Sequence, residues 1–233
     1  MNHYFTNQEL KSNIKEFTAL INEKKYTFLT DNGVFSKKGL DFGTRTLLET
    51  LKIDEIKGNV LDFGCGYGPI GIYIKTNTNS CVDMVDINKR SIHLAKENAK
   101  INKADVNIFE SNIYSNVTKK YDYIITNPPI RVGKKILYQI LFEAKEHLNK
   151  NGELWLVVSK DQGAKSLLKD LEKEYTVKVE NKNKGFYISF TFYELANTAL
   201  GIQAVGNVCE AIFPFSFVCH SFHSVHQLIC LQI

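Results

Sequence analysis

Residues 59–68 read NVLDFGCGYG, and about sixty residues later the segment 121–129 reads YDYIITNPP. The first segment is an apolar strand that runs into three closely spaced glycines. Glycine leaves the backbone bare, so a small charged ligand can approach a helix N-terminus there. The second segment is another apolar strand, and it ends in Asn127-Pro128-Pro129. Because both loops follow strands, they predict a ligand site at the carboxyl edge of a sheet.

Strand and helix signals alternate around these two segments. Apolar residues recur at helical spacing after the glycines, after the capping residue Asn88, and over residues 134–148 and 163–174. Short apolar runs between them predict five strands at 59–63, 81–86, 106–109, 121–126 and 154–158. Such alternation is typical of a parallel sheet with helices on both faces.

Two further strands, 175–179 and 186–192, flank the polar turn 181–185 and predict a closing hairpin. The chain is therefore expected to form an α/β fold, a doubly wound, mostly parallel, seven-stranded sheet with a terminal antiparallel hairpin. Ahead of the sheet, strands at 26–30 and 34–36 are predicted to pair around the turn 31–33, and a helix to follow near Leu47.

These elements divide the 233 residues into three expected parts. Residues 1–58 form a lead-in of short strands and a helix, and residues 59–192 form the core. Residues 193–233 form a tail that does not fit the pattern. The tail contains no Lys or Arg, whereas residues 1–184 hold all 29 cations and 23 acids, a net charge of +6. A moderately basic domain suits a polyanionic partner without proving one.

Cysteine and histidine usage gives weaker signals. Five scattered cysteines argue against a disulfide-stapled secreted fold, and no secretory signal is visible, so a cytoplasmic location is expected. No metal site is expected, because the tail residues Cys219, His220, His223, His226 and Cys230 match no established zinc spacing. Polar residues interrupt the apolar stretches of the tail and argue against a membrane span. We interpret the tail as either an appended oligomer contact or a translation of the wrong reading frame.

The two motifs, in this order and spacing, resemble those of class I S-adenosylmethionine-dependent methyltransferases. Within that superfamily the chain resembles the family typified by ribosomal RNA small-subunit methyltransferase C, which methylates guanine N2. The matching segments are 33–44 (GVFSKKGLDFGT), 62–68, 111–112, 127–130 and 152–154. The resemblance covers roughly residues 1–190 and implies a Rossmann-like methyltransferase fold.

The glycine loop alone is a weak signal, because residues 66–71 also satisfy the dinucleotide pattern G-x-G-x-x-G. A nicotinamide oxidoreductase is therefore an alternative. Asp62 beside the loop argues against it, since a carboxylate repels a pyrophosphate but suits the ammonium of a methionine moiety.

The resemblance implies S-adenosylmethionine as cofactor and assigns residues to it. Asp86, at the end of the second strand, can accept both ribose hydroxyls, and Asn112 can pair with the adenine edge. Phe35, Asp41, Gly43 and Thr44 belong to the segment that closes over the cofactor; from the residues alone they predict only a turn and a helix cap. The full expected cofactor set is Asp62, Gly64, Cys65, Gly66, Gly68, Asp86, Ile87, Asn112 and Asn127.

Asn127-Pro128-Pro129 is the expected catalytic motif. The lone pair of an exocyclic base amine is delocalised into the ring, which makes the nitrogen a poor nucleophile. The Asn127 side-chain oxygen and the Pro128 carbonyl can accept its two N–H bonds and aim the lone pair at the methyl group, so orientation carries the catalysis. The alternative is that Pro-Pro only ends a strand and Asn127 makes a local turn.

Substrate contacts are expected from the residues that follow. Many relatives place a base-stacking aromatic residue after the second proline, whereas this chain has Ile130. Arg131, Lys134 and Lys135 could hold phosphates beside a flipped base, or simply form a solvated helix start.

The sequence thus predicts an RNA methyltransferase that modifies guanine N2 in small-subunit 16S ribosomal RNA. The alternatives are an adenine N6 or protein glutamine methyltransferase, and a non-catalytic binder of S-adenosylmethionine or RNA. A single domain would need a homodimer or a pre-assembled ribosomal particle to grip RNA.

Overall fold

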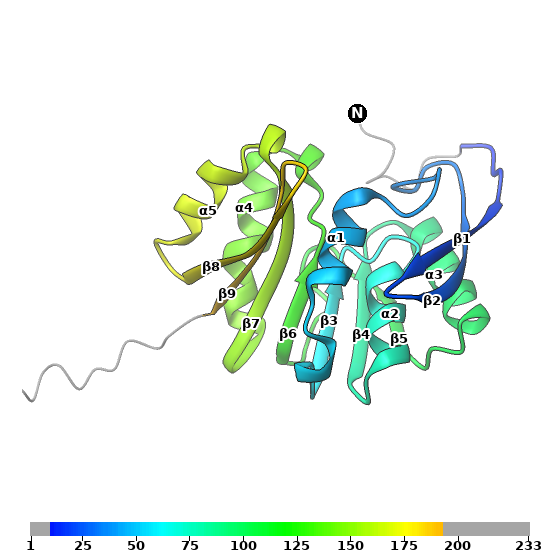
Figure 1. The fold of residues 1–233 in the computed structure, drawn as a ribbon, viewed down its shortest axis with the longest axis horizontal. Helices are drawn as coiled ribbons and strands as arrows, with labels where there is room; N and C mark the ends of the chain where they lie inside the picture. Colours follow the sequence, from blue (N-terminus) through cyan, green and yellow to red (C-terminus); the bar gives the residue numbers. More distant parts are fainter. Residues whose placement is uncertain (1–9, 193–233) are drawn as a thin grey trace, which may run out of the picture. The chain divides into compact units, whose positions relative to one another are not determined.

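The computed structural model describes residues 10–192, with the exception of the Arg131 side chain, and the predictions for the tail 193–233 lie outside the described residues. A seven-stranded sheet runs in the order β5-β4-β3-β6-β7-β9-β8 (Figure 1). The first five strands of this order pair in parallel, and the β8–β9 hairpin joins β7 antiparallel. The expected doubly wound sheet with a terminal hairpin is confirmed.

The strands of this sheet are β3 (Asn59–Phe63), β4 (Cys81–Asp86), β5 (Asn107–Glu110), β6 (Tyr121–Thr126), β7 (Leu148–Ser159), β8 (Thr176–Asn183) and β9 (Phe186–Phe192). The main helices are α1 (Phe42–Thr50), α2 (Pro69–Asn77), α3 (Lys89–Ile101), α4 (Lys134–Glu143) and α5 (Ala164–Leu171). Short 3-10 turns cover Ile53–Glu55, Ile130–Val132, Ala144–His147 and Lys160–Gln162.

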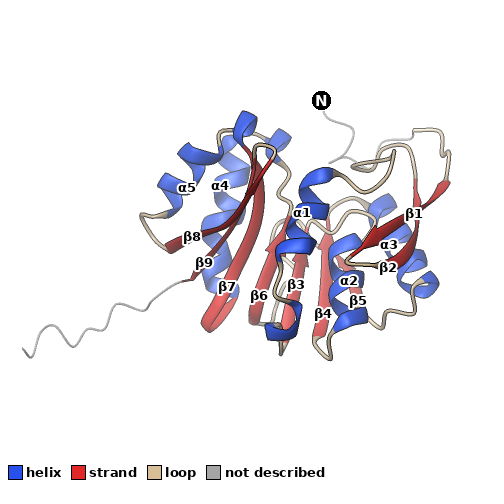
Figure 2. Ribbon diagram, in the orientation of Figure 1, coloured by secondary structure: helices blue, strands red, loops and turns tan. Residues whose placement is uncertain are grey.

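Two hydrophobic clusters make the sheet the middle layer of three, visible in Figure 2 as strands between helices. Side chains of α1, α2 and α3 pack on one face with Val60, Val82 and Ile125. Side chains of α4 and α5 pack on the other face with Leu61 and Ile124. The alternation of Val60 and Leu61 follows from the two-residue period of a strand.

One predicted helix ends earlier than expected. The stripe over residues 134–148 forms α4 only to Glu143, and Leu148 belongs to β7, where it pairs with Tyr121 through a register shift. Periodicity misses this boundary because Leu148 is buried in either structure.

The N-terminal hairpin was paired wrongly in the sequence prediction. Strand β2 (Lys24–Thr30) pairs antiparallel with β1 (Lys15–Ile21), and residues 34–36 form a turn instead. The hairpin turn is Asn22-Glu23, where both residues have positive φ of 45° and 64°. Such a turn matches the twist of two strands, but it lacks the Asn-Gly signal that would have marked it.

The loop after β2 does not pair with that strand, and it forms hydrogen bonds with residues before β1 and with α3. The buried Asp31 carboxylate accepts hydrogen bonds from the Ser12 hydroxyl and from the Asn13 backbone. The Arg90 guanidinium donates to the Asn32 carbonyl at 2.6 Å.

Two asparagines, Asn98 in α3 and the α3 C-cap residue Asn102, attach the hairpin to the core. The Asn98 side chain accepts from the Leu29 N–H at 2.6 Å and donates to the Leu29 carbonyl at 2.9 Å. Asn102 does the same with the N–H and carbonyl of Thr27, at 3.2 and 2.7 Å. Asn98 also donates to the Tyr67 carbonyl in the glycine loop at 2.8 Å. The edge of β2 is therefore paired with side chains of a helix.

Candidate active site

The glycine loop connects β3 to α2 with three glycines in the left-handed region. Gly64, Gly66 and Gly68 have φ of 71°, 58° and 99°, values that other residues rarely adopt. A Cβ on Gly64 or Gly66 would meet no atom within 4 Å, so both positions face open space. Gly68 caps α2, and Pro69 begins the helix. The loop can therefore admit a ligand close to its backbone.

Asp62 lies fully buried at the end of β3, beneath this loop. Its Oδ2 accepts the Gly71 N–H at 2.8 Å, whereas Oδ1 has no hydrogen-bond partner among the described residues. Burial, with Asp86 nearby, raises the pKa of the Asp62 carboxyl to about 7 against the opposing Gly71 hydrogen bond. An orphaned carboxylate oxygen here fits a ligand that carries N–H donors or positive charge.

Asp86 ends β4 beside the same loop. Its two oxygens accept the N–H groups of Gly66 and Asn88, both at 2.8 Å, so the loop and the start of α3 hold the carboxylate in place. Burial raises its pKa, while hydrogen bonds from Asn88, Gly66 and Ile87 oppose the shift. An ionised carboxylate has about four acceptor sites, so hydroxyl groups of a ligand can still bind.

Cys65 is buried inside the loop and 4% exposed. Burial, followed by the charges of Asp62 and Asp86, raises the pKa of its thiol well above the usual range. The thiol stays protonated, in keeping with a small side chain that fills a tight turn.

The loops after β4 and β5 reach the same edge. The Ser111 N–H donates to the Asp86 carbonyl at 3.0 Å, which places the following residue, Asn112, beside the end of β4. The Asn112 side chain is exposed. The structure thus brings the predicted cofactor residues to one edge of the sheet.

Asn127 follows β6, the strand next to β3. Thr126 pairs with Phe63 in the sheet, and its hydroxyl donates to the Phe63 carbonyl at 2.8 Å. Neighbouring strands are separated by about 4.8 Å, so Asn127 begins beside the glycine loop. The two motifs that are far apart in the sequence therefore share one site.

Helix α1 fixes the orientation of the Asn127 side chain. Its Nδ2 donates to the Thr44 hydroxyl at 2.9 Å and to Asp41 Oδ1 at 3.4 Å. Asp41 is also the N-cap of α1 and accepts the Thr44 N–H at 3.1 Å, as the cap interpretation predicted. Because the amide nitrogen is engaged by α1, the Asn127 Oδ1 is the end that can accept a hydrogen bond from a ligand. The sequence prediction did not foresee this pairing.

The residues after Asn127 differ in exposure. Pro128 is buried, and Pro129 caps the 3-10 turn Ile130–Val132. Ile130 is half-buried and packs against the cluster beneath α4. It therefore acts partly as a core residue.

The cations at the start of α4 are exposed. Lys134 forms an ion pair with Asp170 at 3.8 Å and lies over the Tyr138 ring at 4.8 Å. Lys135 is also exposed, and the Arg131 side chain lies outside the described part. Lys134 thus has a partner on α5.

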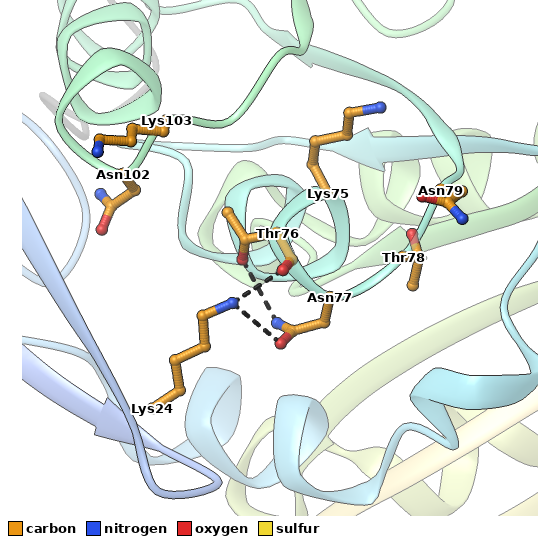
Figure 3. A pocket seen from close by; sticks show the side chains of 8 residues that line it. All are labelled: Lys24, Lys75, Thr76, Asn77, Thr78, Asn79, Asn102 and Lys103. Carbon is orange, nitrogen blue, oxygen red and sulfur yellow. Dashed lines mark hydrogen bonds between the residues drawn. The ribbon is translucent and has the colours of Figure 1, made fainter.

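A separate polar hollow of about 530 Å³ lies where α2 and α3 end (Figure 3). Its lining residues are Lys24, Lys75, Thr76, Asn77, Thr78, Asn79, Asn102 and Lys103. Lys24 donates to the Thr76 carbonyl at 2.8 Å and to Asn77 Oδ1 at 3.2 Å, a helix C-terminal cap. Because α2 runs away from the glycine loop, this hollow lies at the opposite edge of the sheet from Asn127.

Within residues 10–192, no group of three or more His, Cys, Asp or Glu side chains could hold a metal ion. In the same range, no helix has the length and apolar character needed to cross a membrane.

The topology and the loops define the class: a Rossmann-like, S-adenosylmethionine-dependent methyltransferase. The family model for the methyltransferase small domain matches residues 25–189, and the chain belongs to that family. A structure of the T. thermophilus 16S rRNA N2 methyltransferase RsmC, in complex with AdoMet and guanosine, matches with a TM-score of 0.70 and 25% identity. That match covers 78% of this chain and 51% of the other.

Two curated relatives differ in length. The uncharacterized protein YbxB of Bacillus subtilis is 42% identical over 192 residues, which cover 80% of this chain and 96% of the relative. Ribosomal RNA small subunit methyltransferase C of Psychromonas ingrahamii is 33% identical over 180 residues, 75% of this chain and 51% of the relative. The chain thus spans about half the length of the relatives that are named for an activity.

Proposed function

We propose that this methyltransferase modifies the exocyclic amine of a base in RNA, and that the base is guanine, at N2, in small-subunit 16S ribosomal RNA. The observation that carries the proposal is the orientation of Asn127, whose amide nitrogen is held by Thr44 and Asp41. The names of the relatives, which include 16S rRNA N2 and small subunit methyltransferases, support the choice of substrate.

Two acceptors would act on the substrate nitrogen. Asn127 Oδ1 accepts one N–H and the Pro128 carbonyl accepts the other, which draws the nitrogen toward tetrahedral geometry and frees its lone pair. When bound, S-adenosylmethionine supplies an electrophilic methyl group. No strong base is needed, because the proton can leave after transfer; fixed acceptors do the work.

The cofactor is proposed to lie across the ends of β3, β4 and β5. Asp62 faces its ammonium group, Asp86 accepts its ribose hydroxyls, and Asn112 pairs with its adenine. The remaining proposed contacts come from Gly64, Cys65, Gly66, Gly68, Ile87 and Asn127. The orphaned Asp62 oxygen and the open space at Gly64 and Gly66 support this placement.

Pro129 is proposed to fix the direction of the catalytic loop, with Ile130 lining the base pocket. Arg131, Lys134 and Lys135 are proposed to contact phosphates beside the flipped base. Residues 59–192 would form the catalytic core and 1–58 the lead-in, which supplies α1. The contacts of α1 with Asn127 support this division.

The test incubates the protein with labelled S-adenosylmethionine and, separately, with unmodified ribosomal RNA, small subunits, DNA and a protein extract. Label in N2-methylguanosine from the ribosomal samples is the expected result. Label in methyladenine or methylglutamine would overturn the substrate but keep the amine chemistry. Cofactor binding with no label in any sample would favour a non-catalytic binder.

Asn127 is one of nine proposed cofactor residues, so Asn127→Ala should largely retain the affinity for S-adenosylmethionine. It should reduce kcat by a factor of about 10² to 10³, the usual cost of losing one preorganised polar contact. Calorimetry measures the first quantity and label transfer the second. Asn79→Ala, an exposed asparagine at the opposite edge, is the control. An Asn127→Ala variant with full turnover would remove Asn127 from the chemistry.

A further inference from the structure

Within residues 10–192, the position directly after Asn127-Pro128-Pro129 is Ile130 and not an aromatic residue. A base that has left its stack must be held on its face as well as on its edge. Ile130 offers no ring, and it packs partly into the core beneath α4. Another element must therefore supply the flat surface if the substrate is a base.

An aromatic pair lies directly beside the residues that hold Asn127. Phe42 follows Asp41 on the first turn of α1, and its ring centroid is 5.5 Å from that of Phe186 on β9. A Cβ added to Gly43 would lie 2.9 Å from the Phe186 ring, so this glycine lets the ring seat against α1. Both Phe42 and Phe186 are half-buried.

This pair lies on the side of Asn127 away from the cofactor loops. Those loops follow β3, β4 and β5, whereas β7 and β9 lie beyond β6 in the other direction. Phe186 pairs with Ser159 at the carboxyl end of β7, the edge at which Asn127 also lies. A substrate that meets the methyl group at Asn127 must approach from this half of the sheet.

An exposed lysine lies over the Phe42 ring. Lys184 is exposed, and its Nζ lies 5.2 Å from the Phe42 centroid. Its position is set by the Lys184-Gly185 turn, where the Gly185 carbonyl accepts the Lys160 N–H at 2.6 Å. A ring face covered by a flexible cation can exchange that cation for a stacked base.

We propose that Phe42, supported by Phe186, is the surface on which the target base stacks, and that Lys184 moves to the phosphate of the same nucleotide. The ligand is an unpaired purine nucleotide within RNA. This inference rests on the proposed RNA methylation and adds the residues that would select a planar ring. It also accounts for a catalytic loop that has isoleucine at position 130.

The test measures KM for unmodified small-subunit RNA, kcat, and S-adenosylmethionine affinity in Phe42→Leu, Phe42→Trp and the wild type. Phe42→Leu should raise KM by about tenfold, the usual effect of losing one stacked base, while cofactor affinity stays within about twofold. Phe42→Trp should keep KM near the wild-type value because it retains a ring. If Phe42 only fills space in the fold, Phe42→Trp should impair KM more than Phe42→Leu, since Trp is the larger change in side-chain volume.

Lysine variants of the same hairpin provide the matched comparison. Lys178 also lies over aromatic rings, 5.7 Å from Phe190 and 5.1 Å from Phe192, but toward the far end of the hairpin. Lys184→Gln should raise KM about threefold and lower the slope of log KM against log salt by about one, whereas Lys178→Gln should change neither. Lys184→Arg should restore the slope.

The outcomes distinguish a failure of the stacking inference from a failure of the proposed RNA methylation. Wild-type protein that methylates RNA, with an unchanged KM in Phe42→Leu and Lys184→Gln, would overturn the stacking surface alone. Wild-type protein that labels only protein would overturn both. If Phe42→Leu fails to fold, the Phe42→Trp and Lys184→Gln results still decide the matter.

Discussion

The chemistry proposed for Asn127 depends on which end of its amide faces the substrate. An amide nitrogen pointing at a base amine would place donor against donor, and the reaction would have no acceptor. Thr44 and Asp41 prevent this by taking the amide nitrogen, at 2.9 and 3.4 Å. At the scale of one residue, the proposed catalysis therefore depends on the Thr44 hydroxyl, which contacts neither the cofactor nor the substrate in the proposal.

Thr44→Val should lower kcat by about tenfold, because it leaves one Asn127 N–H without its acceptor and lets the amide rotate. Thr44→Ser keeps the hydroxyl and should restore most of the rate. The affinity for S-adenosylmethionine should not change in either variant. Single-turnover label transfer measures the rate, and equal rates for the Val and Ser variants would rule out an orienting role.

Asp62 should make cofactor binding depend on pH. Burial raises its pKa to about 7, so the carboxyl is largely protonated below that pH. A cationic ligand favours the charged form, so binding displaces the proton and affinity should rise with pH up to about 7 and then level off. Between pH 5.5 and 7 the dissociation constant should fall by up to about tenfold per pH unit, the limit for one proton.

Calorimetry from pH 5.5 to 7.5 measures this dependence. The range stops there because a ligand α-amino group itself titrates at about 7.7–8.0. Asp62→Asn is the control and should bind more weakly, with an affinity that does not follow pH. The same slope in both proteins would assign the dependence to another group.

At the scale of elements, two asparagine side chains at the C-terminal end of α3 hydrogen-bond with the free backbone edge of β2, as a neighbouring strand would. Asn98 and Asn102 are four residues apart, which advances about 6 Å along a helix, and Leu29 and Thr27 are two residues apart, which advances about 6.7 Å along a strand. The near match lets each asparagine bond one backbone N–H and one carbonyl. This pairing also blocks an edge that could otherwise recruit another strand.

Asn98→Ala should lower the free energy of unfolding by about 2–4 kcal/mol, because three backbone groups lose their partner in a buried position. The Tyr67 carbonyl is one of them, so cofactor affinity should fall as well. Asn102→Ala, at a half-buried position, is the comparison and should cost less. Urea denaturation measures the free energy of unfolding of both variants. An equal loss of stability in the two would contradict the larger contribution expected from the buried Asn98.

The same elements show what could be predicted from the sequence. Strands β3, β4 and β6 were predicted with the observed bounds, because each is a short and mostly apolar segment with a clear end. Gly64 follows β3, Asp86 ends β4, and Asn127-Pro128 follows β6. The predicted hairpin partner of β2, residues 34–36, was wrong. The observed arrangement depends on hydrogen bonds between Asn98, Asn102 and the β2 backbone, which no local sequence pattern reveals. The link from Asn127 to Thr44 was missed for the same reason: it joins residues 83 positions apart, which no local pattern records.

At the scale of the whole molecule, the basic charge of residues 1–184 should appear in substrate binding. Each phosphate contact releases counterions, so KM for RNA should rise by about tenfold or more between about 50 and 200 mM salt. The affinity for S-adenosylmethionine should change by less than about twofold, since its proposed site is built mainly from acids and glycines and holds no cation. Label-transfer kinetics at each salt concentration measure KM, and calorimetry measures the cofactor affinity. A flat KM would show that the cations do not contact RNA.

The strand order also separates the two proposed ligand sites along the chain itself. The cofactor loops after β3, β4 and β5 come from residues 62–112, and the proposed substrate groups other than Phe42 come from residues 127–186, with an exposed loop at 118–120 between them. A chimera joined at that turn would inherit its cofactor affinity from one parent and its choice of target from the other. Helix α1 is the exception, because it precedes both segments and holds Asn127 from across the join. A graft must therefore take α1 from the parent that supplies Asn127, or the recombinant would bind its cofactor but transfer methyl groups more slowly, as expected for Thr44→Val.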